Sequence, residues 1–361
     1  MSNEALSETD RYLISIIRVI ATLMIIACHM VQEINNSILQ QSAQFLNVGV
    51  QVFFIISAFL YGKKRINNVR VWLLRRGLRI LIPFYLFMLI LFVYKSEFLS
   101  LDVGYVKPLI YMLNLQGFLH NYTTGAAHLW FVSVIMVCYF ITPLLTQLQF
   151  FLNKAISSHL LYSIIICAIT IQIIAAFYLP NNIYSFGPMY LVYIYLYIFV
   201  YCFVRSNIII ERKHYIIFTL FTIIAVSIRL ITKYITGSYI TNFRTTLYEH
   251  VVVSYSHALL GLWIFITLFL FIRHFNQYFQ IIKKPIMHCD KYSYEIYITH
   301  YMYIAGPIKL MHLTNNLLIN IVGVLVCTYM SAILLHYLSN IVTNRLKLMG
   351  CNNVTQNYNL S

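Results

Sequence analysis

Long apolar runs alternate with short polar segments along the whole of this 361-residue chain. Most runs are close to the roughly 20 residues that an α-helix needs to cross the hydrocarbon core of a bilayer. The runs lie approximately at 12–31, 46–62, 80–96, 128–148, 159–179, 187–204, 215–232, 253–272, 292–311 and 317–341. This pattern predicts an all-α, polytopic membrane protein with about ten transmembrane helices.

The composition excludes a water-soluble protein. Apolar residues make up 60% of the chain and charged residues only 10%, too few to cover a surface exposed to water. About ten spans use most of the residues, so we expect a single transmembrane domain over 1–361, with short tails at 1–11 and 343–361. The seven cysteines form no CxxC pair and fall mostly inside the apolar runs, which is typical of packing residues.

The positions of the 25 Lys and Arg residues predict the orientation of the chain. They are concentrated in alternate polar segments, above all in 63–79, 205–213, 273–291 and the C-terminal tail. The positive-inside rule places these segments, and with them both termini, on the cytoplasmic side of the cell membrane. The net charge of +15 therefore follows membrane topology. We expect membrane lipid, and no nucleic acid, as a partner.

Two ionisable residues, Arg18 and His29, lie inside the first apolar run. Eleven positions at about 100° each end only about 20° past three full turns, so the two side chains share one helix face, about 16 Å apart along the axis. Ionisable residues inside a span are candidates for function. The stripe predicts a pathway through the membrane, with Arg18 nearer the cytoplasm. The alternative is that Arg18 snorkels to the headgroups and His29 caps the outer helix end.

Glu33 follows His29 by four residues. If the helix continues, its carboxylate can hold one imidazole nitrogen and leave the other to accept a proton. The alternative is a solvated loop residue.

Motifs of other site classes are absent from the sequence. The histidines lack the spacing and the cysteine neighbours of a zinc site, and there is neither a Gly-rich phosphate loop nor a GxSxG elbow. We therefore expect no metal site and no permanently bound cofactor.

Five short motifs follow one another along the chain, and together they resemble the integral-membrane acyltransferases of the type 3 family. They are RVIATLMIIACH from Arg18 to His29, GVQVFFIISAFL with Ser57, RRGLRILIP with Arg75, Arg76 and Arg79, HLWFV with His128 and Trp130, and YSYEIYITH with Tyr297 and His300. Ala58 departs from the family pattern by replacing the usual glycine. The resemblance spans nearly the whole chain.

The resemblance implies transfer of an acyl group, commonly acetyl, from cytoplasmic acetyl-CoA or another acyl-CoA. The acceptor would be a hydroxyl of a cell-surface polysaccharide or of a lipid-linked glycan. In this chemistry Arg18 would hold the pantetheine or the thioester oxygen as negative charge develops, and His29 would take the hydroxyl proton. The three arginines at 75, 76 and 79 would bind CoA phosphates, although topology alone also explains basic residues there.

The resemblance adds Ser57, His128, Trp130, Tyr297 and His300 as possible supporting residues. The rival function is a polysaccharide exporter or flippase, because a polar stripe across the membrane also suits a sugar path. A glycan polymerase ranks last, because the outer loop 97–127 contains Lys107 as its only Lys or Arg. The acyl group, the identity of the acceptor, the existence of an acyl-enzyme and the oligomeric state stay open.

Overall fold

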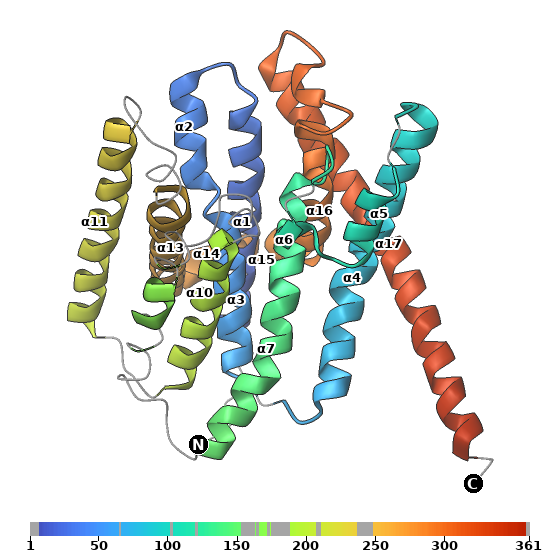
Figure 1. Ribbon diagram of the computed structural model, residues 1–361, viewed down its shortest axis with the longest axis horizontal. Coiled ribbons are helices and arrows are strands. Elements are labelled where there is room, and N and C mark those ends of the chain that lie inside the picture. The colour runs from blue at the N-terminus through green and yellow to red at the C-terminus, as the bar shows by residue number, and fades with distance from the viewer. Residues whose placement is uncertain are drawn as a thin grey trace.

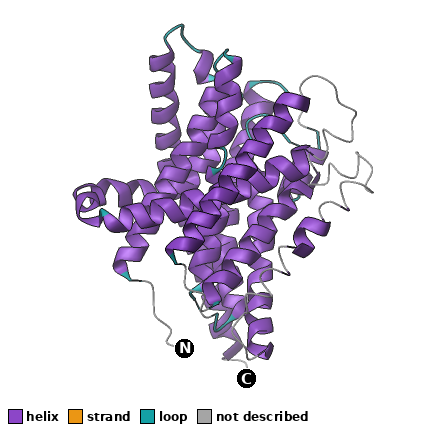
Figure 2. Ribbon diagram, turned by 90° about the vertical axis from the view of Figure 1, so that its left-hand side faces the viewer, coloured by secondary structure: helices purple, strands orange, loops and turns teal. Residues whose placement is uncertain are grey.

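The computed structural model describes residues 7–64, 66–101, 104–119, 122–152, 163, 166–171, 174, 188–206, 211–236 and 248–358. Within these ranges the chain is built of helices joined by short loops, with no strand (Figure 2). The all-α prediction is therefore confirmed.

Seven described helices are long and apolar enough to cross a membrane. They are Glu8–Gln32, Ser37–Gly62, Val69–Phe98, Ala127–Gln147, Arg212–Thr232, Val251–His274 and Leu317–Lys347, and a shorter apolar helix covers Tyr190–Arg205. The chain is thus a multi-pass membrane protein. The predicted number of about ten is not confirmed: the run at 292–311 contains a helix of only 12 residues, and most of the run at 159–179 lies outside the described residues.

The principal elements lie side by side as a bundle (Figure 1). Their bounds are α1 Glu8–Gln32, α2 Ser37–Leu46, α3 Gly49–Gly62, α4 Val69–Val93, η1 Tyr94–Phe98, α5 Val106–Met112, α6 Gln116–Leu119, η2 Ala127–Leu129, α7 Trp130–Leu152, α10 Pro188–Arg205, α11 Arg212–Thr236, η3 Tyr248–Val253, α13 Ser254–His274, α14 Asn276–Phe279, η4 Gln280–Ile282, α15 Lys283–Lys291, α16 Ser293–Ile304, η5 Leu310–His312 and α17 Leu317–Tyr358. Helix α17 runs along one side of the bundle.

Helix α1 begins at a capped N-terminus and is mostly buried. The Ser7 hydroxyl accepts a hydrogen bond from the Asp10 backbone N–H at 3.0 Å, and acidic residues in the first turn complement the helix dipole. Leu13, Ile17 and Ile25 are fully buried, and the helix contacts α2, α3, α13, α15 and α16. Arg18 and His29 are therefore presented to other helices of the bundle.

Gly49 explains the close packing of α3 against α1. A Cβ atom at this position would lie 2.4 Å from the backbone oxygen of Ala21, so any larger residue would push the two helices apart. The close packing of α3 against α1 thus explains the glycine at the start of the motif GVQVFFIISAFL.

The segment before α7 is held in place by several contacts. Gly125 has a φ of +90° and packs against Pro307 and Leu91, a backbone conformation that glycine adopts without strain. The Lys95 ammonium donates to the Thr123 hydroxyl at 2.6 Å. These contacts fix the approach of the chain to η2, which carries His128.

Candidate functional site

A cavity of about 130 Å³ lies beside Arg18, between helices α1, α3, α4, α7 and α16. Its lining includes four residues singled out from the sequence: Arg18, Ser57, Arg76 and Arg79. Arg75 does not line the cavity, and its side chain is exposed.

Arg18 is paired with Asp290 of α15. One guanidinium nitrogen, Nη1, donates to Oδ1 at 2.7 Å and to Oδ2 at 2.9 Å. The two side chains are 22% and 11% exposed. The remaining N–H groups of the planar guanidinium stay available to a ligand. Asp290 was not predicted from the sequence. The available signals were that it is one of only ten acidic residues in the chain and that it lies three positions before Ser293.

The lining of this cavity carries an excess of positive charge, from Arg18, Arg76 and Arg79. The Arg76 guanidinium lies over the ring of Tyr61, 5.0 Å from its centroid, and its Nε is buried with no hydrogen-bond partner among the described residues. No carboxylate is among the residues that line the cavity. The pKa of Lys64 is lowered, first by partial burial and then by the charges of Arg76 and Arg11. An anion is the ligand that this arrangement favours.

At the other end of α1, His29 belongs to a cluster of three histidines and one tyrosine. The His29 ring lies 5.3 Å from His300 in a stacked arrangement and 4.8 Å from Tyr301 edge to face, measured between centroids. His128 of η2 lies 4.7 Å from His300 and 6.5 Å from His29. His128 and His300 are buried, whereas His29 is partly exposed. A ligand therefore reaches His29 first.

Hydrogen bonds to carbonyl groups assign the tautomers of the two buried histidines. A carbonyl only accepts, so Nε2 of His128 donates to the backbone oxygens of Tyr297 and Ile298, at 2.9 and 3.1 Å. Nδ1 of His300 donates to the same Tyr297 oxygen at 2.6 Å. The opposite nitrogens, His128 Nδ1 and His300 Nε2, are unprotonated and have no hydrogen-bond partner among the described residues.

His29 is oriented by Gln32, one turn further along α1. Its Nδ1 donates to the amide oxygen of Gln32 at 3.1 Å, which leaves Nε2 as a proton acceptor. The orienting role predicted for Glu33 stays a prediction: Glu33 is the C-cap residue of α1, and no hydrogen bond joins its carboxylate to His29 among the described contacts. Its carboxylate instead contacts Nε2 of His312 at 2.9 Å.

Tyr297 of α16 lies between the cavity and the histidine cluster. Its ring contacts Phe53 and Phe131, which line the cavity, at 6.3 and 5.3 Å between centroids. On its other side it lies 5.2 Å from His128, and its hydroxyl donates to the His128 backbone oxygen. Tyr297 thus separates the cavity that contains Arg18 from the cluster that contains His29.

Trp130 lies outside both groups. Its indole stacks on Tyr190 of α10, 4.4 Å between centroids, so its contacts are those of helix packing. Sequence reasoning missed Tyr61 and Tyr301, which are neutral residues in apolar runs, and Gln32, which directly follows the first run. Within the described ranges, no group of three or more His, Cys, Asp or Glu side chains is arranged to hold a metal ion.

Comparison with known proteins supplies one match. A family model described as an acyltransferase domain, of type 3, matches residues 11–337, nearly the whole chain. No curated protein and no solved structure matches.

Proposed function

Because the chain belongs to the type 3 acyltransferase family and is therefore a membrane acyltransferase, we propose that it transfers an acyl group, commonly acetyl, from cytoplasmic acyl-CoA to a hydroxyl of a glycan on the outer side of the cell membrane. The acceptor is a cell-surface polysaccharide or its lipid-linked precursor. In this orientation both termini are cytoplasmic.

One observation carries the proposal. A cationic cavity and a group of unprotonated imidazole nitrogens lie at two levels of the same helix, α1, about 16 Å apart along its axis. Guanidinium groups match the phosphates of an acyl-CoA, and an unprotonated imidazole is the usual general base for a hydroxyl. The donor site and the general base of an acyl transfer would thus lie at two different depths in the membrane.

The chemistry proceeds without a permanent cofactor. His29 Nε2 takes the hydroxyl proton while the hydroxyl oxygen forms a bond to the thioester carbonyl carbon. The carbon–sulfur bond breaks, and the CoA thiolate takes up the proton to leave as the thiol. The guanidinium of Arg18, held by Asp290, binds the pantetheine arm of the donor, because Arg18 lies about 16 Å from His29 along α1 and does not reach a thioester that reacts there. The narrow pantetheine arm has to carry the thioester past Tyr297 to His29.

The test uses inside-out membrane vesicles that contain the wild-type protein and its glycan acceptor. Acetyl-CoA labelled in the acetyl group is added to the exposed cytoplasmic face, and label is expected on glycan in the lumen. Label found only on acceptor added to the cytoplasmic face would contradict the proposed crossing. Mass spectrometry of surface glycans from cells with and without the gene identifies the acyl group. Unchanged glycan masses together with loss of surface glycan would favour the exporter instead.

A further inference from the structure

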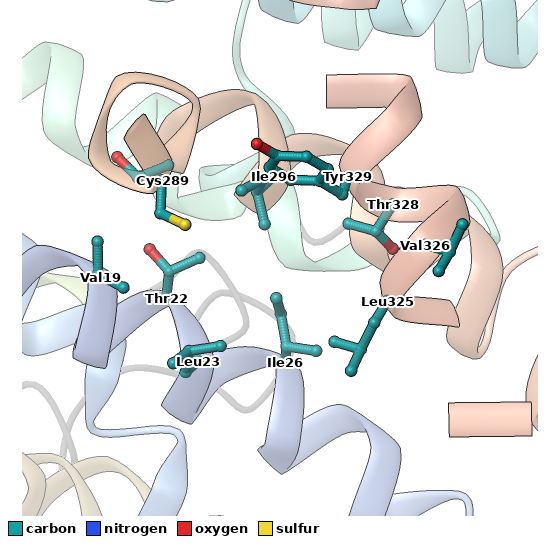
Figure 3. A pocket seen from close by; sticks show the side chains of 11 residues that line it. Val19, Thr22, Leu23, Ile26, Cys289, Ile296, Leu325, Val326, Thr328 and Tyr329 are labelled. Atoms are coloured by element: carbon teal, nitrogen blue, oxygen red, sulfur yellow. The ribbon is translucent and has the colours of Figure 1, made fainter. Parts of the chain in front are cut away.

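A second cavity lies on a neighbouring face of α1, between that helix, the α15–α16 segment and α17 (Figure 3). Its volume is about 370 Å³. In Figure 3 the side chains of α1 face those of α17 across the cavity, with Cys289 and Ile296 at one end. The lining residues carry no charge; they are Val19, Thr22, Leu23, Ile26, Cys289, Ser293, Ile296, Leu325, Val326, Thr328 and Tyr329. We call this cavity the α1–α17 groove.

The groove opens on the lipid-facing side of the helix bundle. Leu23, Leu325 and Val326 line it and are at the same time 54%, 40% and 55% exposed. Both α1 and α17 are membrane-spanning helices by length and hydropathy, so these exposed surfaces face lipid. A water-borne ligand has no access there, and a hydrocarbon chain matches the uncharged lining.

The groove also leads to the histidine cluster. Ile26 precedes His29 by three residues on the continuous helix α1, which is about 4.5 Å along the axis. Ser293 lines both the groove and the cavity of Arg18. The groove therefore comes within one helical turn of His29 and adjoins the arginine cavity at Ser293.

We propose that the α1–α17 groove binds the hydrocarbon chain of a lipid-anchored acceptor. This inference rests on the proposed function and decides between its two acceptors: the glycan is acylated while attached to its lipid. The chain in the groove holds the headgroup at the outer end of α1, where His29 takes the proton of a sugar hydroxyl. The reaction that releases the glycan from its lipid then follows acylation.

The test is photocross-linking of the full-length protein in phosphatidylethanolamine–phosphatidylglycerol vesicles. The probe is polyprenyl phosphate with a diazirine in its chain, and the labelled peptides are mapped by mass spectrometry. Labelling is expected at groove residues of α1 and α17, and unlabelled polyprenyl phosphate should compete with the probe whereas extra phosphatidylethanolamine should not.

A matched pair of valines on α17 supplies the variants. Val326 lines the groove, whereas Val322 is 50% exposed and lies outside it. Val326→Trp fills the groove and should lower labelling there about tenfold, equivalent to about 1.4 kcal/mol. Val322→Trp should leave labelling unchanged. Acyl transfer to the lipid-linked acceptor should fall with Val326→Trp only, while CoA binding stays at the wild-type level in both variants.

The outcomes separate this inference from the proposed function. Labelling spread evenly over lipid-facing residues, or equal competition by phosphatidylethanolamine, would overturn the groove as an acceptor site even if acyl transfer is observed. Specific labelling of the groove in a protein that transfers no acyl group would leave the lipid site standing and remove the proposed function.

Discussion

Arg18 of α1 and Asp290 of α15, which are 272 positions apart in sequence, are joined through a single nitrogen, Nη1, that contacts both carboxylate oxygens at 2.7 and 2.9 Å. This contact fixes the guanidinium that lines the cationic cavity. It also ties the first helix to the segment that leads into α16.

Asp290→Asn should therefore lower both stability and activity. The amide keeps the shape of the carboxylate but removes its charge, and a hydrogen bond to a charged group contributes about 2 kcal/mol. We expect a lower thermal unfolding temperature in detergent and a reduced rate of acyl transfer. The control is Glu8→Gln, because the exposed Glu8–Lys283 pair at 3.0 Å should contribute little. Equal effects of the two variants would contradict a special role for Asp290.

His29→Ala should abolish acyl transfer without preventing membrane insertion. Removal of a general base typically costs about 10²-fold to 10⁴-fold in rate. The matched control is His274→Ala, which removes an exposed histidine at the end of α13 and should leave the rate unchanged. Full activity of His29→Ala would remove this histidine from the mechanism.

Arg18→Lys should also be inactive, because an ammonium cannot reproduce the planar guanidinium fork.

The tautomers of the buried histidines can be tested with paired amide substitutions. The side-chain nitrogen of Gln can replace Nε2, and that of Asn can replace Nδ1. His128→Gln and His300→Asn should therefore keep the hydrogen bonds to the Tyr297 carbonyl and unfold at nearly the wild-type temperature. His128→Asn and His300→Gln lose these bonds and should cost about 1–3 kcal/mol of stability. The reverse order of stabilities would show that the assigned tautomers are wrong.

The first pair also asks what the unprotonated nitrogens do, because both variants remove them. A lower rate of acyl transfer in His128→Gln or His300→Asn, at unchanged stability, would indicate that these nitrogens take part in the reaction. An unchanged rate would assign both histidines to packing around His29.

The arginines of α4 should differ in their effect on the donor. Arg76→Gln and Arg79→Gln should each raise the KM for acyl-CoA about tenfold, the equivalent of about 1.4 kcal/mol, with unchanged preference for the acceptor. Arg75→Gln is the control, because this side chain does not line the cavity. An equal rise in KM for all three variants would point to general attraction by the basic loop.

Binding of CoA should be accompanied by proton uptake at alkaline pH. The lowered pKa of Lys64 means that part of this ammonium is deprotonated before its normal range is reached. An anion bound near Arg76 offsets the repulsion from Arg76 and Arg11 and raises the pKa again, so affinity should fall as pH rises through the lowered pKa. Calorimetry in buffers of different ionisation enthalpy measures the uptake. Lys64→Met should reduce it.

Residues on one helix face could be predicted from the sequence, because helical geometry sets their relative positions. Arg18 and His29 share a face of α1. The helical nature of the apolar runs was predictable for the same reason. That Arg76 and Arg79 line the cavity and Arg75 does not could not be predicted, because all three lie within about 100° of one another around α4. Which of these residues act in catalysis stays a prediction.

Contacts between distant helices could not be predicted in this way. The Asp290 partner of Arg18 depends on how α15 packs against α1. Whether α1 continues through Glu33 could not be predicted, because a helix boundary cannot be placed within one turn from the apolar pattern alone. The contact of Gln32 with His29 is an i,i+3 pair within α1 that the apolar pattern does not single out.

The separation at Tyr297 has a consequence for the energetics of the cell. A continuous polar channel from Arg18 to His29 would let protons and small ions leak across the membrane and dissipate the proton-motive force. The rings of Phe53 and Phe131 pack against Tyr297 on that route, and the bond from the Tyr297 hydroxyl to the His128 backbone holds the Tyr297 ring in place. An acyl group that passes these rings would move from the cytoplasmic to the outer side of the membrane while the bilayer remains impermeable to ions.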